Sequence, residues 1–480
     1  MTYTLWLLAG TFYGFIIGLI PVAGVMTALL TIYSFVDIFR SDPYTLVVFT
    51  TAIVVSCSIG DNFSSIMMNV PGAAGSAATM VDGFPMAQRG EGARALSAAV
   101  ITSTINGLIW GVVVFVFLPY YGAIVLKFGI PEQLAFVILA FTSVCFITNH
   151  YWVRGIVSLA LGIFVGLIGQ DPGTGAERFT FGWQYLGHGI QIAPIMAGVL
   201  ALPELLELYF TKKEIVKFEI NNYWEQVKQG AKDSFVYLKD GIRGGAIGAF
   251  IGLLPGVGGA IADWIAYSNT IALNKNETFG NGNIRGVIGC EGSNNAQKAT
   301  GYIPTVLFGI PAAPFEVVIL SLFTIVGIEL GTPALLADTK FFDVLTYSYM
   351  ASMALTFVLS FVAIRYIGKI FELPIDVWFW ILIALIVWSC VQYTGYIEDY
   401  LMLIACTCLG LSLRYLKMSR AAFIIGFVLS NRIESLFTQY RLLFNWYDVI
   451  LRPISLTLVL VTIVAIVYGV FFNNAKVNYT

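Results

Sequence analysis

The sequence predicts an all-α polytopic membrane protein of roughly 10–14 membrane segments, arranged in two internal repeats. Three observations predict this class. Of the 480 residues, 58% are hydrophobic and 11% are charged, whereas about a quarter are charged in a soluble domain. The mean hydropathy is +0.82. Continuous apolar runs of about 20 residues, the length of a membrane-crossing helix, recur along the chain, for example over residues 108–126 and 454–472.

Composition excludes several other classes of protein. The apolar runs are continuous and do not alternate in segments of about ten residues, so helices are expected and a transmembrane barrel is not. No soluble catalytic domain is evident, and we expect the protein not to be an enzyme. Six cysteines without CxxC spacing and two distant histidines, His150 and His188, predict no metal site. No cofactor is expected, and no nucleic-acid partner, since no dense basic cluster occurs outside one linker.

That linker is the one long polar stretch, and it divides the chain. Because basic residues collect in short cytoplasmic loops, we expect it to be cytoplasmic, either as a solvated connector or as a docking surface. The predicted organisation is a first membrane repeat over 1–208, the cytoplasmic linker over 209–245 and a second membrane repeat over 246–480. The basic residues of the linker are Lys212, Lys213, Lys217, Lys228, Lys232, Lys239 and Arg243.

Four short motifs recur in the same order on both sides of the linker. GLIPVAG (18–24) corresponds to GLLPGVG (252–258), and MNVPGAA (68–74) corresponds to FGIPAAP (308–314). The offsets of these two pairs are 234 and 240 residues, and two weaker pairs have offsets of 243 and 228. Duplicated halves with Gly- and Pro-interrupted segments are typical of secondary transporters, whose repeats are often inverted. We expect inverted repeats, and the loop charges leave parallel repeats open.

The first motif marks expected breaks in membrane helices. Proline removes a backbone donor and glycine permits a sharp turn, so a helix is interrupted where they gather. The glycine content resembles that of phosphate-binding loops, but no GK[ST] follows, which argues against a nucleotide site. The expected structural breaks are Gly18, Pro21, Gly24, Gly252, Pro255, Gly256 and Gly258.

The second motif predicts the substrate site. Residues 67–85 and 291–314 combine prolines, glycines and polar side chains, and broken backbone is tolerated in a membrane only where it faces protein or a water-filled cavity. Re-entrant helix-turn-helix hairpins are therefore expected. Freed N–H groups beside amides and hydroxyls suit an organic anion, although helix packing is the alternative for a single hydroxyl such as Ser64, Ser76 or Thr79. The expected substrate-binding residues are Asn62, Ser64, Ser65, Asn69, Pro71, Gly72, Ser293, Asn294, Asn295, Thr305, Gly309 and Pro311.

Two carboxylates accompany these polar groups. Asp61 and Glu291 are the candidates for coupling to an ion, because a carboxylate held in a membrane is costly unless it titrates or binds a cation. The alternative for each is a position at a segment end, in contact with water. The coupling ion is expected to be H⁺ or Na⁺, and the sequence does not choose between them.

The motifs also carry a family resemblance over nearly the whole chain. NVPGAAGSAATMVDGFPMAQRGEGARAL (69–96), GLLPGVGG, GVIGCEGSNNAQKATGYIPTVLFGIP and the segment 423–460 resemble the TctA family, the large membrane subunit of tripartite tricarboxylate transporters. The resemblance implies a multi-pass protein of the bacterial inner membrane. It also implies a small TctB-like membrane subunit and a periplasmic TctC-like binding protein as partners. Val22 and Gly60-Asp61-Asn62 depart from the family pattern, which usually has a second glycine and a Gly-Gly-Ser run there.

These observations together predict a secondary active transporter subunit. We expect it to import small organic di- or tricarboxylates by symport, driven by an ion gradient and supplied by the periplasmic binding protein. The alternative is a passive anion channel with paired half-helices meeting in the pore. Uptake against a concentration gradient that collapses with an ionophore distinguishes the carrier from the channel.

Overall fold

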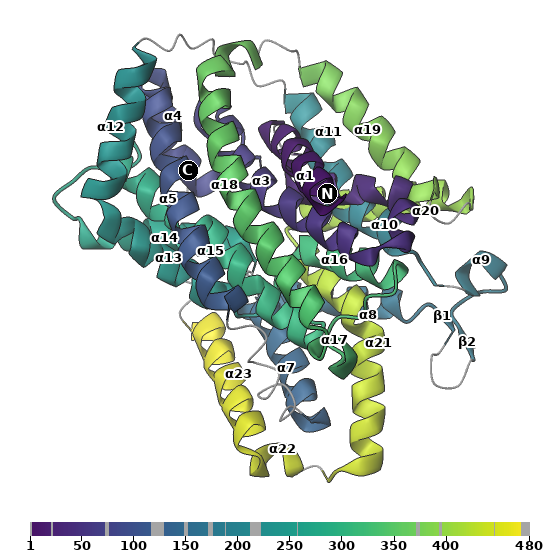
Figure 1. Cartoon of the computed structure of the whole chain (residues 1–480). Coiled ribbons are helices and arrows are strands. Elements are labelled where there is room, and N and C mark those ends of the chain that lie inside the picture. The colour runs from purple at the N-terminus through teal and green to yellow at the C-terminus, as the bar shows by residue number, and fades with distance from the viewer. Residues whose placement is uncertain are drawn as a thin grey trace.

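The computed structural model describes residues 2–20, 23–72, 76–116, 129–147, 152–170, 176–187, 189–211, 222–256, 258–370, 375–392, 396–445 and 447–471. Within them the protein is almost entirely helical, and the only sheet is a short antiparallel hairpin of β1 (Gly169–Gln170) and β2 (Glu177–Arg178). Figure 1 shows this hairpin, with the short helix α9, projecting from one side of the helical body.

The first half of the chain forms α1 (Thr2–Leu19), α2 (Gly24–Leu30), the 3-10 helix η1 (Thr31–Ser41), α3 (Pro43–Met68), α4 (Ala77–Gln88), α5 (Gly92–Gly111), the π-helical η2 (Val112–Val116), α7 (Ile130–Thr142), η4 (Ser143–Ile147), α8 (Trp152–Gly166), α9 (Gln184–Gly187), α10 (Ile192–Met196), η5 (Ala197–Ala201) and α11 (Leu202–Thr211). The second half forms α12 (Tyr223–Val236), α13 (Leu238–Gly252), α14 (Gly259–Leu273), α15 (Ile284–Phe308), α16 (Pro314–Ile325), α17 (Pro333–Leu336), α18 (Thr339–Ile370), α19 (Ile375–Gln392), α20 (Glu398–Tyr415), α21 (Arg420–Leu443), α22 (Asp448–Leu451) and α23 (Pro453–Phe471).

Length and composition confirm the predicted all-α polytopic membrane class. Shorter apolar helices, such as Trp152–Gly166 and Pro453–Val467, accompany the long ones. Within the described residues, the stretches long and apolar enough to cross a membrane are six: Thr2–Leu19, Gly24–Ser41, Pro43–Met68, Gly92–Phe115, Thr339–Tyr366 and Arg420–Leu443.

Two long, buried helices, α3 and α15, begin in the same way. The side chain of Asp42 accepts a hydrogen bond from the N–H of Tyr44 at the start of α3. The side chain of Asn283 accepts one from the N–H of Arg285 at the start of α15. Such caps satisfy N–H groups that have no partner in the first turn of a helix.

Glycines bring α1 close to α3. A methyl group added to any of three glycines on α1 would come within 2.8 Å of a main-chain oxygen of α3, so no larger side chain fits without separating the helices. The three contacts are Gly10 with Phe49, Gly14 with Ile53 and Gly18 with Cys57.

The same contacts recur between α13 and α15. Here an added methyl group would come within 2.5 Å of the main-chain oxygens. The glycines lie 234 residues after those of α1, and their partners lie 240 residues after those of α3, which are the offsets of the recurring motifs. The three contacts are Gly244 with Gly289, Gly248 with Ser293 and Gly252 with Gln297.

Helix α12 and the start of α13 occupy part of the predicted linker. Residues 212–221, with Lys212, Lys213 and Lys217, lie outside the described residues. α12 packs against α5, where an added methyl on Gly230 would come 2.4 Å from the oxygen of Arg94. Figure 1 shows α12, α13 and α14 together on one side of the molecule. The boundary at 246 therefore falls inside α13, and the division into two repeats and a linker stays a prediction.

Candidate functional site

The predicted breaks end α3 and α15 in the same conformation. The residue after each helix, Asn69 or Gly309, is left-handed, with φ of 55° and 66°. Asn and Gly adopt this conformation more readily than other residues. Pro71 and Pro311 follow two residues later, where they prevent the helix from resuming. The chain then enters α4 after the first turn and α16 after the second. Residues 73–75 of the first turn lie outside the described part of the chain.

The two breaks of the second half lie side by side. The N–H of Gly256 donates to the oxygen of Pro311 over 3.3 Å, and the N–H of Gly258 donates to the oxygen of Ala312 over 3.1 Å. These bonds satisfy backbone groups that the interrupted helices leave free. The GLLPGVG and FGIPAAP motifs, more than 50 residues apart in the sequence, therefore form one irregular region.

The corresponding first-half motif is described only in part. α1 ends one residue after Gly18, and α2 begins at Gly24. Pro21 and Val22 lie outside the described residues. In the second half, α13 ends at Gly252 and is followed by Pro255.

A glutamate organises the second turn. The carboxylate oxygen Oε2 of Glu316 accepts hydrogen bonds from the Thr305 hydroxyl at 2.5 Å, from the N–H of Ala312 at 2.6 Å and from the N–H of Ala313 at 3.2 Å. Thr305, a predicted substrate residue, therefore contacts Glu316, and the other oxygen of Glu316 has no described partner although it is buried.

An acidic side chain also lies against the first turn. A methyl group added to Gly72 would be 2.8 Å from Oδ1 of Asp61. In the second half, a methyl group added to Gly301 would be 2.5 Å from Oε1 of Glu316. In both halves a glycine thus leaves room for a carboxylate beside the broken helix.

Glu291 joins the two halves. Its Oε2 accepts hydrogen bonds from Nδ2 of Asn62 on α3 at 2.7 Å and from Nδ2 of Asn294 at 3.2 Å, and its Oε1 accepts one from the Thr79 hydroxyl on α4. Asn294 also donates to the main-chain oxygen of Ser58 over 3.0 Å. The structure therefore brings three predicted residues, Asn62, Glu291 and Asn294, into one buried cluster.

The other predicted residues have separate partners. The hydroxyls of Ser64 and Ser65 donate to the main-chain oxygen of Asp61 in their own helix, at 3.1 and 2.9 Å. Ser293 donates to Asp263 on α14. Asn295 donates to Ser103 on α5 over 2.9 Å. Within the described residues these four side chains therefore have partners outside the Glu291 cluster.

Sequence reasoning missed three charged residues of this region. Lys298 donates to Oδ1 of Asn294 over 2.5 Å, Asp263 accepts from Ser293, and Glu316 holds the second turn. The available signal was an ionisable residue within an otherwise apolar or small-residue segment, which marks a functional position in a membrane protein. Lys298 stands directly within the quoted run EGSNNAQKATG.

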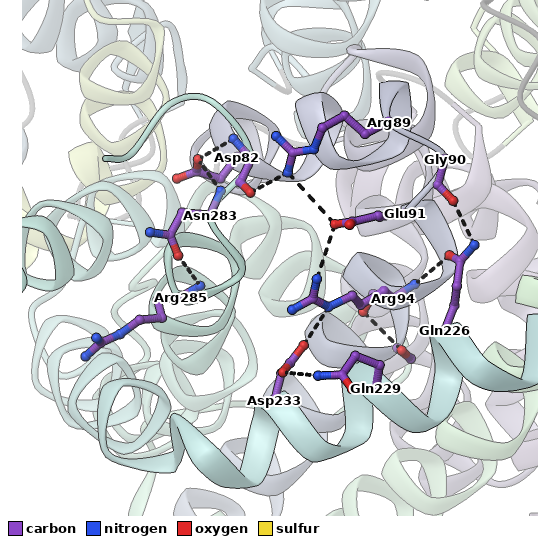
Figure 2. Close-up of polar contacts among 12 residues, drawn as sticks. Asp82, Arg89, Gly90, Glu91, Arg94, Gln226, Gln229, Asp233, Asn283 and Arg285 are labelled. Carbon is purple, nitrogen blue, oxygen red and sulfur yellow. Dashed lines mark hydrogen bonds and ion pairs between the residues drawn. The ribbon is translucent and has the colours of Figure 1, made fainter. Parts of the chain in front are cut away.

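A second polar cluster, the α4 clamp, fastens α4 to the loop before α15 (Figure 2). Oδ1 of Asp82 accepts from the N–H groups of Gly280, Gly282 and Asn283 at 2.8, 2.9 and 2.8 Å. Arg89 donates to the main-chain oxygens of Gly282, at 2.6 Å, and Asn281. Asp82 thus binds main-chain N–H groups of this loop and Arg89 binds its main-chain oxygens. Together they position the loop against α4.

Ion pairs extend from the clamp to α12, as Figure 2 shows. Arg94 contacts Glu91 at 3.3 Å and Asp233 of α12 at 2.7 Å. On the loop before α15, the hydrogen bond from Asn283 and the nearby Arg285 hold the pKa of Glu277 below its usual range. The signature run 69–96 is therefore partly explained by these structural contacts.

A cavity of about 530 Å³ opens at the second break. Its lining includes Phe308 and Gly309 together with Gln191 and Arg432 of α21. The end of α15 therefore borders an open space that contains a cationic side chain.

Comparison with known families decides which kind of membrane protein this is. The model of the tripartite tricarboxylate transporter TctA family matches residues 4–425. The chain belongs to the TctA family. The resemblance found in the motifs is thereby confirmed, and membership indicates a role in tricarboxylate transport by a multi-pass membrane protein.

Similar proteins occur in Agrobacterium vitis. This TctA chain is 28% identical over 433 residues to the "Uncharacterized 52.8 kDa protein in TAR-I ttuC' 3'region", covering 89% of this chain and 85% of that protein. It is 30% identical over 188 residues to the "Uncharacterized protein in TAR-II ttuC' 3'region", covering 39% of this chain and 78% of that protein. No solved structure matches the chain.

Family membership bears on the remaining predictions. A tripartite transporter implies partner proteins, and a transporter family indicates a non-enzymatic role. Both turns that end α3 and α15 lie inside the matched range, as do Asn62, Glu291 and Lys298.

Proposed function

We propose that the protein is the carboxylate-translocating subunit of an ion-driven uptake system in the bacterial inner membrane. The observation that carries the proposal is the cluster at Glu291, where a buried carboxylate of α15 is hydrogen-bonded to Asn62 of α3 and Thr79 of α4. Polar groups of this kind are costly in a membrane unless they serve transport. Here they meet beside two interrupted helices, which is where secondary transporters bind their substrates.

The substrate class is a small organic di- or tricarboxylate. The family description names tricarboxylates, and the region holds a buried cationic side chain, Lys298. The coupling ion is H⁺ or Na⁺, for which Asp61 and Glu291 are the proposed sites. The partners are a small TctB-like membrane subunit and a periplasmic TctC-like binding protein, which supplies the substrate.

The recurring contacts support a duplicated architecture, and we propose that the two repeats are inverted. The α1–α3 and α13–α15 pairs use glycines at matching positions, and each pair is followed by a broken hairpin. In transporters with inverted repeats, the substrate lies where the repeats meet, and the Asn62–Glu291 hydrogen bond of 2.7 Å spans that junction.

Radiolabelled citrate uptake into proteoliposomes tests the proposal. The protein is reconstituted with and without the two partner subunits, under an imposed Na⁺ or H⁺ gradient. We expect citrate to accumulate above its external concentration with one of the gradients and to be lost on adding the matching ionophore. Citrate flux that only equilibrates would favour a passive channel, and no gradient-driven uptake of citrate or succinate would contradict the proposal.

A further inference from the structure

We propose that the ammonium group of Lys298 binds a carboxylate of the transported anion. The inference rests on the proposed function and deepens it, because it assigns the recognition of the substrate's negative charge to one residue. Sequence patterns did not single out this residue. Lys298 lies on α15, one turn after Asn294 and between the Glu291 cluster and the second break. Its side chain is nine-tenths buried, with 9% of its surface exposed.

The contacts of Lys298 leave its charge without a direct counter-ion in the described part of the chain. Its Nζ donates to Oδ1 of Asn294 over 2.5 Å and to the main-chain oxygen of Asn294 over 3.4 Å. Both acceptors are neutral, and an ammonium has three N–H donors. A lysine kept only to neutralise neighbouring acids would gain most by pairing directly with one of them.

Asp61, Asp263, Glu291 and Glu316 lie within electrostatic range of Lys298, and two of these acids have hydrogen-bond donors of their own. Glu291 accepts from two amides and Thr79, and Asp263 accepts from Ser293. A carboxylate brought in by a substrate could therefore pair with Lys298 without first breaking one of these bonds.

Unpartnered polar atoms nearby indicate that the region accommodates a polar ligand. Both side-chain atoms of Gln297, Nε2 and Oε1, are buried without a hydrogen-bond partner, as are Oδ1 of Asn62 and Oε1 of Glu316. Buried polar atoms usually have partners. Three of these four atoms are oxygens, which do not bind an anion, whereas Nε2 of Gln297 is a donor next to Lys298 in the sequence. A carboxylate at Lys298 could accept from Gln297 as well.

The test measures citrate and succinate affinity by titration of the purified protein in nanodiscs. Lys298→Gln removes the charge, and we expect its citrate dissociation constant to rise by about tenfold or more, the loss typical of a hydrogen bond between charged partners. Lys275→Gln is the matched control, because Lys275 is exposed on the loop between α14 and α15 and should leave citrate affinity unchanged. Lys298→Arg keeps the charge and should retain part of the affinity.

Each outcome decides the inference. Unchanged citrate affinity in Lys298→Gln, in a protein that still transports citrate, overturns this inference and leaves the proposed function standing. No binding or transport of either anion by the unaltered protein overturns both. If Lys298→Gln does not fold, Lys298→Arg decides. A shifted ratio of citrate to succinate affinity supports direct contact, and unchanged affinities for both anions overturn it.

Discussion

The adjacent amides Asn294 and Asn295 have different surroundings. Successive residues on a helix are rotated by about 100°, so Asn294 faces Glu291 and Lys298 while Asn295 faces Ser103 of α5. The main-chain oxygen of Asn295 also accepts from the Tyr349 hydroxyl of α18 over 3.0 Å. The amide of Asn294 therefore lies in the candidate site, and the amide of Asn295 ties α15 to α5.

This difference predicts two distinct mutant phenotypes. Asn294→Ala should weaken citrate binding by roughly tenfold, because the amide orients both Glu291 and Lys298 and a lost bond to a charged group costs about 1.5–3 kcal/mol. Asn295→Ala should lower the thermal unfolding midpoint while leaving citrate affinity nearly unchanged. Citrate titration and thermal unfolding of both variants provide the measurement. Equal effects of both variants on affinity would mean that neither amide acts specifically on the anion.

The acidic candidates yield a second prediction at this scale. Asp61→Asn and Glu291→Gln should each change the dependence of citrate uptake on the imposed Na⁺ or H⁺ gradient, since an amide neither titrates nor carries charge. Glu277→Gln is the control, because Glu277 lies on the exposed loop before α15. If citrate uptake by Asp61→Asn and by Glu291→Gln depends on the gradients as it does in the unaltered protein, neither residue is a coupling site.

At the scale of elements, α4 is held by the α4 clamp as well as by its own hairpin. Asp82 is fully buried and satisfies three N–H groups of the loop before α15, while its other oxygen accepts from the Tyr267 hydroxyl over 2.9 Å. A helix of the first half is thus attached to the start of α15, and Thr79 on the same helix reaches Glu291. Substitutions in the α4 clamp should therefore also alter the geometry of the Glu291 cluster.

We expect Asp82→Ala to destabilise the protein by roughly 2–4 kcal/mol, because it leaves several N–H groups without their acceptor. Thermal unfolding in detergent should show the lower midpoint. Asp37→Ala is the matched control, since Asp37 is exposed and paired with Arg40 in the next turn, a pair of small energetic value. A midpoint for Asp82→Ala as high as that of the control would refute a clamping role.

At the scale of the whole molecule, the breaks were predictable and many of their partners were not. Pro71, Pro311 and the GLLPGVG motif interrupt helices because proline and glycine act locally. The bond from Asn62 to Glu291 joins residues 229 positions apart, and the Asp82 contacts span about 200 positions. Contacts between residues so far apart in the sequence depend on how the helices pack, which a local sequence pattern does not specify. The sequence offered a signal for Lys298, an ionisable residue in a small-residue run, but its burial depends on the packing of helices.

We predict the orientation of the whole molecule from the basic linker. A cysteine introduced at Lys232, which is exposed on α12, should react with an impermeant thiol reagent only after the cells are opened, since basic loops are retained in the cytoplasm. A Cys408→Ser background removes an exposed native thiol. Strong labelling of intact cells would reverse the predicted topology.

A structure of the protein with bound citrate tests the central claim, that the anion site lies where α3 and α15 meet. The account predicts density for citrate bordered by Asn62, Asn294 and Lys298, with a carboxylate on the Lys298 ammonium. Density confined to the cavity beside Arg432, with the Glu291 cluster unchanged and no citrate at the junction, would contradict it.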